Sequence, residues 1–223
     1  MARQLNLPLG TRPALGRDDY FVTPGNAPVL AALEDWQNWP SGALAIVGGA
    51  GAGKTHLAHV FAALSGARVV DGASLDPGSA DNLAIAPLAI DGADLVGDDT
   101  CLFHIYNLMA QRGHPLLMTA THAPARWEIQ LPDLISRLGT VPIAEIPQPD
   151  DMLLTAVLAK HFADRGIAPP VQLIPYLVAR IERSMGAAAQ VVADLDQRAL
   201  SEGRPIGVRL AAQVLDNPGF EGA

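Results

Sequence analysis

The sequence predicts an α/β domain whose parallel sheet carries helices on both faces, followed by a small helical domain at the C-terminal end. Short apolar runs alternate with amphipathic stretches up to residue 149, which is typical of parallel strands joined by helices. A glycine-rich octapeptide, GGAGAGKT at residues 48–55, joins an apolar run to an amphipathic stretch. After the breaker Pro147-Gln148-Pro149 the strand signal ends, and only helical segments follow.

Five apolar runs are predicted as the strands of the sheet. Each is unbroken rather than alternating, as expected for parallel strands that are buried on both faces. They are residues 44–47, 68–70, 88–90, 116–119 and 141–146. Helices between them are expected at residues 27–36, 54–64, 101–111 and 131–138.

Three parts are expected along the chain. Residues 1–18 are polar, contain Pro and Arg and lack a helical period, which indicates a flexible arm. Residues 19–149 form the α/β domain and residues 150–223 the helical one. The helices of this last part are predicted at residues 150–165, 172–182, 187–201 and 208–215, with Asp150 or Asp151 as the first N-cap.

The composition indicates a globular cytoplasmic protein. At 223 residues and 49% apolar, the chain can build one large and one small domain. A single cysteine, Cys101, excludes an internal disulfide framework. We find neither a leader nor an apolar stretch of bilayer length, which argues against secreted and membrane classes. The net charge of −8 argues against sequence-specific DNA binding, which needs a basic surface.

The octapeptide fits the phosphate-binding pattern G-x-x-x-x-G-K-[ST] in the strand-to-helix context that the pattern requires. Its backbone N–H groups and the start of the next helix are expected to surround nucleotide phosphates. Lys54 would reach the terminal phosphates, and the Thr55 hydroxyl would hold Mg²⁺. The alternative is a glycine-rich turn without a ligand. The predicted nucleotide contacts are Gly49, Ala50, Gly51, Ala52, Gly53, Lys54, Thr55 and His56.

An acid at the end of another buried strand should complete such a site. Asp91 follows the run Leu88-Ala89-Ile90 and is predicted to hold Mg²⁺ opposite Thr55, although an ordinary turn residue is the alternative. The next position, where a second carboxylate would polarise the attacking water, is Gly92. Asp94, Asp98 and Asp99 lie downstream and do not occupy that position, so nucleotide binding is better supported than turnover.

The order of these motifs resembles the DnaA-like branch of AAA+ proteins. It comprises the octapeptide, Asp91, LLMTATHAP at residues 116–124 and LPDLISRL at residues 131–138. The resemblance spans nearly the whole chain. It implies an AAA+ P-loop domain with a helical lid, and ADP or ATP with Mg²⁺ as the bound cofactor.

The arm resembles the sliding-clamp-binding peptide that precedes the AAA+ core in some regulators of this branch. A glutamine and leucines of such a peptide dock on an apolar pocket of the clamp while the backbone stays extended. A chain end without a partner is the alternative. The residues concerned are Gln4, Leu5, Leu7, Pro8 and Leu9.

The resemblance also assigns roles near the nucleotide. It makes Arg137 an arginine finger that acts on a nucleotide in a neighbouring subunit, with a surface ion pair as the alternative. Thr121 and Gly186 stand where the branch usually has the sensor I acid and the sensor II arginine. Arg183, three residues before Gly186 and so expected on the same helix face, is predicted to reach the phosphates instead.

The segment before the first helix is predicted to wrap the adenine, because aromatic and β-branched residues suit a flat base. An edge segment that packs on the core is the alternative. The residues concerned are Tyr20, Phe21, Val22 and Asn26.

Taken with the resemblance, these features predict a negative regulator of replication initiation that docks on the sliding clamp and stimulates hydrolysis of ATP bound to the initiator DnaA. A basic DNA-binding domain is not expected after the lid, since only a short segment follows residue 215. The alternatives are an autonomous AAA+ ATPase of the helicase-loader or remodeller type and a small-molecule kinase. Whether the chain also forms a homo-oligomer stays open.

Overall fold

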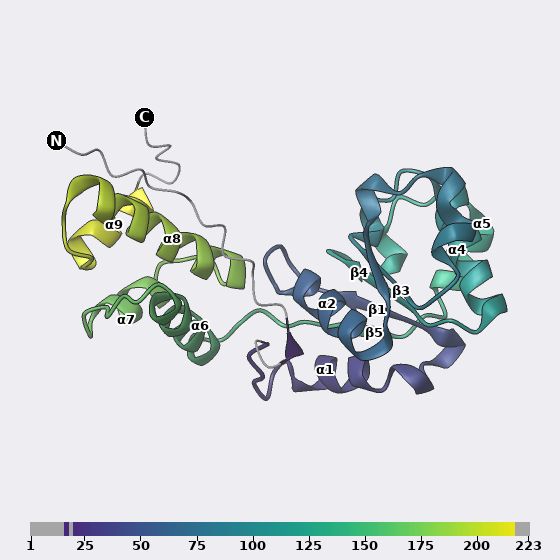
Figure 1. Cartoon of the computed structure of the whole chain (residues 1–223), viewed down its shortest axis with the longest axis horizontal. Helices are drawn as coiled ribbons and strands as arrows, with labels where there is room; N and C mark the ends of the chain where they lie inside the picture. Colours follow the sequence, from purple (N-terminus) through teal and green to yellow (C-terminus); the bar gives the residue numbers. More distant parts are fainter. Residues whose placement is uncertain (1–15, 18–19, 217–223) are drawn as a thin grey trace.

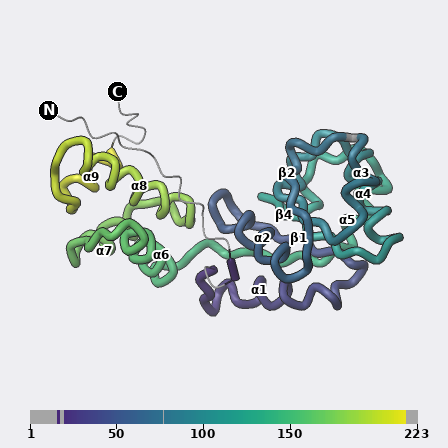
Figure 2. Tube along the Cα trace, viewed as in Figure 1, coloured from purple at the N-terminus to yellow at the C-terminus, as the bar shows by residue number. Residues whose placement is uncertain are grey.

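The computed structural model describes residues 16–17 and 20–216, which form two lobes arranged along the longest axis (Figure 1). An α/β lobe is followed by a helical lobe, and residues 146–150 connect them (Figure 2). The predicted clamp-binding residues 4–9 lie outside the described residues.

The sheet confirms the predicted fold class. Five parallel strands stand in the order β2-β3-β4-β1-β5. Val47 at the end of β1 lies opposite both Ala120 of β4 and Glu145 of β5. The carboxyl ends of β4, β1 and β5 therefore lie together at one end of the sheet. The strands are β1 (Ala43–Val47), β2 (Arg68–Asp71), β3 (Leu88–Asp91), β4 (Leu116–Ala120) and β5 (Ile143–Glu145).

Helices cover both faces of the sheet, as predicted (Figure 1). Alternate residues of β1 point to opposite faces of the sheet: Leu44 and Ile46 pack against one helical layer, and Ala43 and Ala45 pack against the other. The first layer contains α1 (Ala27–Glu34) and α2 (Lys54–Ser65). The second contains α3 (Ala80–Leu83), α4 (Asp99–Arg112) and α5 (Pro132–Leu138).

The prediction that each strand is buried on both faces is confirmed for the inner strands β1 and β4 and is wrong for the outer strands β2 and β5. All five residues of β1 and of β4 are buried, whereas β2 and β5 are partly exposed along their length. These two strands form the edges of the sheet, where one neighbour and part of the helical cover are missing. Ile143 of β5 is accordingly 50% exposed.

Several predicted boundaries shift because of local capping. The helix predicted to begin at Cys101 starts at Asp99, since the Asp98 side chain accepts hydrogen bonds from the Thr100 and Cys101 N–H groups. The first helix ends at Glu34, and Trp36 belongs to a separate 3₁₀ turn. The short helix α3 was not predicted.

The helical lobe has an apolar core of its own, built around Phe162 and Leu158 of α6 with Leu173 of α7 and Leu195 of α8. Asp150 is the N-cap of α6, and its carboxylate accepts a hydrogen bond from the Leu153 N–H at 2.7 Å. The helices are α6 (Asp151–Asp164), α7 (Leu173–Val178), α8 (Met185–Glu202) and α9 (Val208–Asp216). Across the described residues, each helix is too short or too polar to cross a bilayer.

A close backbone contact beside the sheet predicts a stability effect. A Cβ on Gly72 would lie 2.1 Å from the Gly92 carbonyl oxygen, so the turns after β2 and β3 meet only because residue 72 has no side chain. We expect Gly72→Ala to lower the free energy of unfolding by about 1–3 kcal/mol or more. Gly97→Ala, where a Cβ meets nothing within 4 Å, is the control and should change it by less than about 0.5 kcal/mol. Urea unfolding of both variants tests this, and equal stabilities would contradict it.

Candidate nucleotide-binding site

Residues 48–53 of the octapeptide form a loop between β1 and α2, and Lys54 and Thr55 begin the helix, in the predicted strand-to-helix context. Gly51 and Gly53 have φ angles of +65° and +95°, which favour glycine and let the backbone curl. The Gly48 N–H donates to the Ala120 carbonyl oxygen at 3.1 Å, which fixes the loop beside the end of β4. α2 then begins at Lys54, so its N-terminus opens toward the loop.

Lys54 is folded back over this loop. Its Nζ donates hydrogen bonds to the carbonyl oxygens of Gly48, at 2.7 Å, and Gly49, at 2.9 Å. Burial lowers the pKa of Lys54, and the carboxylates of Asp94 and Asp91 partly oppose this shift. The ammonium group therefore lies on the glycine-rich loop, within electrostatic reach of Asp91 at the end of β3 and of Asp94 after it.

Asp91 is held between two threonines from different elements. Thr55 Oγ1 of α2 donates to Asp91 Oδ2 at 2.6 Å, and Thr119 Oγ1 of β4 donates to Asp91 Oδ1 at 2.5 Å. The structure thus brings the predicted pair Thr55 and Asp91 together. Thr119 is fully buried, and sequence reasoning missed it; the signal was a hydroxyl within the otherwise apolar run LLMTA.

The helical lobe, which we also call the lid, contacts the glycine-rich loop through a hydrogen bond between backbone groups. The Gly186 N–H in the first turn of α8 donates to the Gly51 carbonyl oxygen at 3.1 Å. A Cβ on Gly51 would lie 2.9 Å from the Gly186 nitrogen, and one on Gly186 would lie 3.2 Å from the Gly51 Cα. The absence of side chains at both Gly51 and Gly186 favours this close approach, and the constraint is stronger at Gly51.

Arg183 is not placed as its spacing from Gly186 implied. Ser184 is the N-cap of α8, with its side chain accepting from the Ala187 N–H, so Arg183 precedes the helix and the argument from a shared helix face is wrong. Its guanidinium instead pairs with Asp151 at 2.6 Å and donates to the Pro149 carbonyl oxygen at 3.3 Å. A contact between Arg183 and phosphate stays a prediction.

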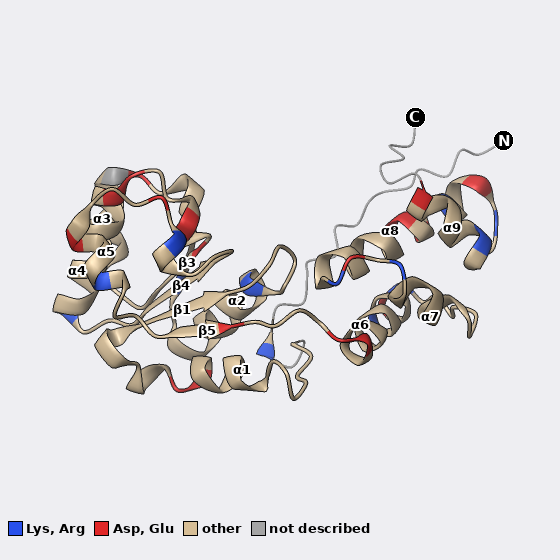
Figure 3. Cartoon of the chain, turned by 180° about the vertical axis from the view of Figure 1, so that it is seen from behind, with Lys and Arg blue, Asp and Glu red and all other residues tan. Residues whose placement is uncertain are grey.

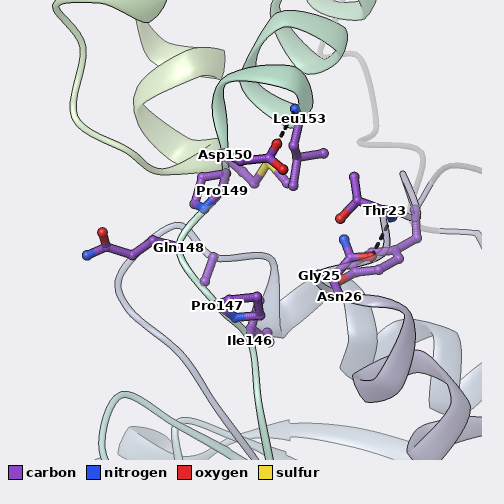
Figure 4. Close-up of a pocket in the computed structure, with 12 residues that line it drawn as sticks. Thr23, Gly25, Asn26, Ile146, Pro147, Gln148, Pro149, Asp150 and Leu153 are labelled. Atoms are coloured by element: carbon purple, nitrogen blue, oxygen red, sulfur yellow. Dashed lines mark hydrogen bonds between the residues drawn. The ribbon is translucent and has the colours of Figure 1, made fainter.

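A narrow cleft lies between the two lobes, beside the loop (Figure 4). Its walls come from three distant segments of the chain. Tyr20, Thr23, Gly25 and Asn26 come from the segment before α1, and Ala52 comes from the loop. Ile146, Pro147, Gln148, Pro149 and Asp150 come from the connection, and Leu153 and Met185 from the lid.

Two of the four residues predicted to wrap adenine line this cleft. Tyr20 is 7% exposed and packs edge-on against His56 with ring centroids 5.4 Å apart, and burial raises its pKa to about 12. Asn26 fixes the segment, since its carboxamide accepts from the Thr23 N–H at 2.7 Å and donates to the Phe21 carbonyl oxygen at 2.9 Å. Phe21 and Val22 are 44% and 41% exposed and do not line the cleft.

The opposite wall of the cleft was missed by sequence reasoning. The available signal was Pro147-Gln148-Pro149, which we interpreted only as a breaker. Ile146 and Pro147 follow β5 directly, so they lie at the carboxyl ends of the strands, as the loop after β1 does. Leu153 and Met185 gave no local signal, because they reach the cleft only when the lid packs beside the loop.

Arg137 lies in the last turn of α5. This helix stands on the side of the α/β lobe away from the helical lobe (Figure 1). The Arg137 Cζ stands 5.4 Å from the centroid of the Phe103 ring, and within the described residues its guanidinium forms no ion pair. The structure therefore keeps Arg137 exposed and does not bring it to the glycine-rich loop of its own chain. In Figure 3 the other Lys and Arg residues are spread over both lobes.

Comparisons with known proteins identify the fold. No protein-family model matches the sequence. Domain III of the Thermotoga maritima replication initiation protein DnaA superposes with a TM-score of 0.78 at 18% identity, covering 92% of this chain and 97% of that one. AMPPCP-bound DnaA from Aquifex aeolicus gives 0.70 at 14% identity (85% and 67% covered), and the Thermotoga maritima RuvB branch migration motor gives 0.72 at 16% identity (90% and 71% covered). The chain therefore has a DnaA-like AAA+ fold.

Proposed function

We propose that the chain binds ADP or ATP in the cleft between its lobes. The phosphates lie against the N–H groups of residues 49–55, and the base lies at the cleft beside Tyr20. Support comes from the curled loop, the start of α2 and the Lys54 ammonium, which together offer positive charge to an anion. DnaA structures of the same fold carry AMPPCP, which supports this class of ligand.

The residues present also fit a magnesium ion. Thr55 offers a hydroxyl oxygen and Asp91 a carboxylate oxygen, the hard ligands that Mg²⁺ prefers when it also binds phosphates. When bound, the ion neutralises charge on the phosphate oxygens. Thr119 orients the Asp91 carboxylate through its own hydrogen bond.

We further propose that the protein is a counterpart of Hda, the DnaA-related negative regulator of replication initiation. It docks on the sliding clamp through Gln4, Leu5, Leu7, Pro8 and Leu9 and presents Arg137 to ATP held by DnaA. The placement of Arg137 supports this proposal: the side chain is exposed and has no ion pair in the described part of the chain. The helix that carries it, α5, lies on the side of the α/β lobe away from the helical lobe. A planar guanidinium with permanent charge suits the γ-phosphate of a neighbour.

Hydrolysis of DnaA-bound ATP tests this function. The assay compares DnaA alone, DnaA with this chain, and DnaA with this chain and DNA-loaded clamp, beside the chain incubated alone with ATP. Strong acceleration only in the complete mixture supports the regulator. Fast turnover by the isolated chain, with no effect on DnaA, would favour an autonomous ATPase instead.

The clamp-binding arm is expected to be separable from the AAA+ core. Changing Gln4, Leu5 and Leu7 together to Ala removes the glutamine and the leucines that would dock on the clamp. We expect clamp affinity to fall below detection in surface plasmon resonance, with ADP affinity and thermal stability unchanged. A variant with Ala2 and Arg3 replaced by Ser is the control and should bind the clamp normally. A triple variant with normal clamp affinity would show that the arm is not the docking segment.

A further inference from the structure

Gly92 stands at the position where a water-polarising acid is expected. It begins a turn that changes the direction of the chain. Its φ angle is +77°, and its carbonyl oxygen accepts from the Leu95 N–H at 2.9 Å, which closes the 3₁₀ turn Ala93–Leu95. The turn brings Asp94 back over the end of β4. There Asp94 Oδ2 accepts a hydrogen bond from the Thr121 N–H at 2.8 Å.

This anchor places Asp94 beside the phosphate loop. Thr121 follows Ala120, whose carbonyl oxygen accepts from the Gly48 N–H, so Thr121 and the start of the loop are neighbours. The carboxylates of Asp94 and Asp91 both act to raise the pKa of Lys54, against the effect of burial. An acid two positions after Gly92 thus reaches the region where the related branch has its sensor I acid.

Asp94 and Asp91 differ in what their oxygens can still bind. Both oxygens of Asp91 accept hydroxyl hydrogen bonds, from Thr55 and Thr119. Among the described residues, Asp94 has a partner for Oδ2 only. Asp94 is partly exposed and lines an open cleft formed by residues 93–99 and 102 and residues 127–130, so water has access to this residue.

The neighbouring acids have other structural tasks. Asp98 caps α4 through the Thr100 and Cys101 N–H groups. Asp99 accepts from the Gln130 N–H at 2.6 Å and from the Leu131 N–H at 3.2 Å. Asp94 is therefore the downstream acid that combines an anchor at the loop with an oxygen available to water.

We propose that Asp94 is the general base for hydrolysis of a nucleoside triphosphate bound to the chain's own phosphate loop. The inference rests on the proposed nucleotide binding and adds an intrinsic activity to it. A water oxygen attacks the γ-phosphorus while the bond from that phosphorus to the bridging oxygen breaks, leaving its electron pair on ADP. The water proton passes to Asp94 and then to the phosphate product. ATP and water thus give ADP and inorganic phosphate.

The intrinsic reaction is slow, because α5, which carries Arg137, lies on the side of the α/β lobe away from the helical lobe, and position 186 has no arginine to neutralise the γ-phosphate. Turnover without an arginine finger is expected on the order of 10⁻⁴ to 10⁻³ s⁻¹, as in other NTPases. Such a rate remains far below that of a motor.

Asp94→Asn tests the proposal, because an asparagine oxygen can keep the hydrogen bond from Thr121 and cannot take a proton. Asp98→Asn is the control, since asparagine caps helices as well as aspartate. We expect single-turnover ATP hydrolysis to fall at least about 100-fold in Asp94→Asn and to stay at the wild-type rate in Asp98→Asn. Affinities for ADP and AMPPCP, measured by titration, should change less than threefold in either variant.

A second readout does not depend on rate. After incubation with ATP and desalting, chromatography of the extracted nucleotide should find ADP on the wild type and on Asp98→Asn, and ATP on Asp94→Asn. Wild-type hydrolysis by Asp94→Asn, or a wild-type protein that holds ATP unchanged, would overturn the role of Asp94 and leave nucleotide binding intact. Failure of the wild type to bind any nucleotide would instead overturn the proposed function itself.

Discussion

Replacing Arg137 with alanine should abolish stimulation of DnaA-bound ATP hydrolysis, with a loss on the order of 10³ in rate. The side chain is exposed at the end of α5 and packs over Phe103, so its removal should leave the fold, the bound nucleotide and clamp binding unchanged. Arg137→Lys should not restore activity, because a point charge does not reproduce the planar fork. Single-turnover hydrolysis on DnaA, with DNA-loaded clamp present, measures the effect.

Arg126→Ala provides the control for this result. Arg126 is also an exposed arginine of the α/β lobe, in the 3₁₀ turn Pro124–Arg126, and its loss removes the same charge from a different place. It should stimulate DnaA like the wild type. An Arg137→Ala protein that remains fully active would contradict the action of Arg137 in trans.

Lys54→Ala should weaken nucleotide binding strongly. The ammonium group lies over the loop, and a charge-assisted hydrogen bond to phosphate contributes about 1.5–3 kcal/mol, which corresponds to an affinity loss of about 10- to 150-fold. Isothermal titration with ADP and ATP measures the loss. We also expect ADP to bind the wild type at least as well as ATP, because Thr121 and Gly186 replace the acid and the arginine that would contact the γ-phosphate.

Lys160→Ala is the matched control, since Lys160 on α6 is the second of the two lysines in the chain. It changes net charge by the same amount and lies in the lid. Its nucleotide affinity should equal that of the wild type. Equal affinity in Lys54→Ala would contradict the assignment of the loop as the phosphate site.

The strands and the phosphate loop were predictable because their causes are local. Unbroken apolar runs predicted the inner strands, and the octapeptide predicted a curled loop between β1 and α2 that the φ angles of Gly51 and Gly53 now explain. Exposure of the edge strands β2 and β5 was not predictable, because strand order is set by packing between distant segments. A run of apolar residues does not predict whether its strand will pair with one or two neighbouring strands.

The site required tertiary information for its remaining parts. The cleft joins Tyr20 to Pro147 and Met185, which are far apart in sequence and meet only when the lid packs beside the loop. Arg183 shows the converse error, because its assignment assumed a helix that in fact begins after the Ser184 cap. Ser184 was a visible N-cap signal, and weighing it would have placed Arg183 outside the helix.

The most direct test of action in trans follows the label on one nucleotide. DnaA is loaded with α-labelled ATP, the wild-type chain is loaded with unlabelled ADP, and the two are mixed with or without DNA-loaded clamp under single-turnover conditions. We predict that labelled ADP accumulates on DnaA rapidly only when the chain and the clamp are both present. Labelled ATP that decays on DnaA at the same rate with and without the chain would contradict the proposed function.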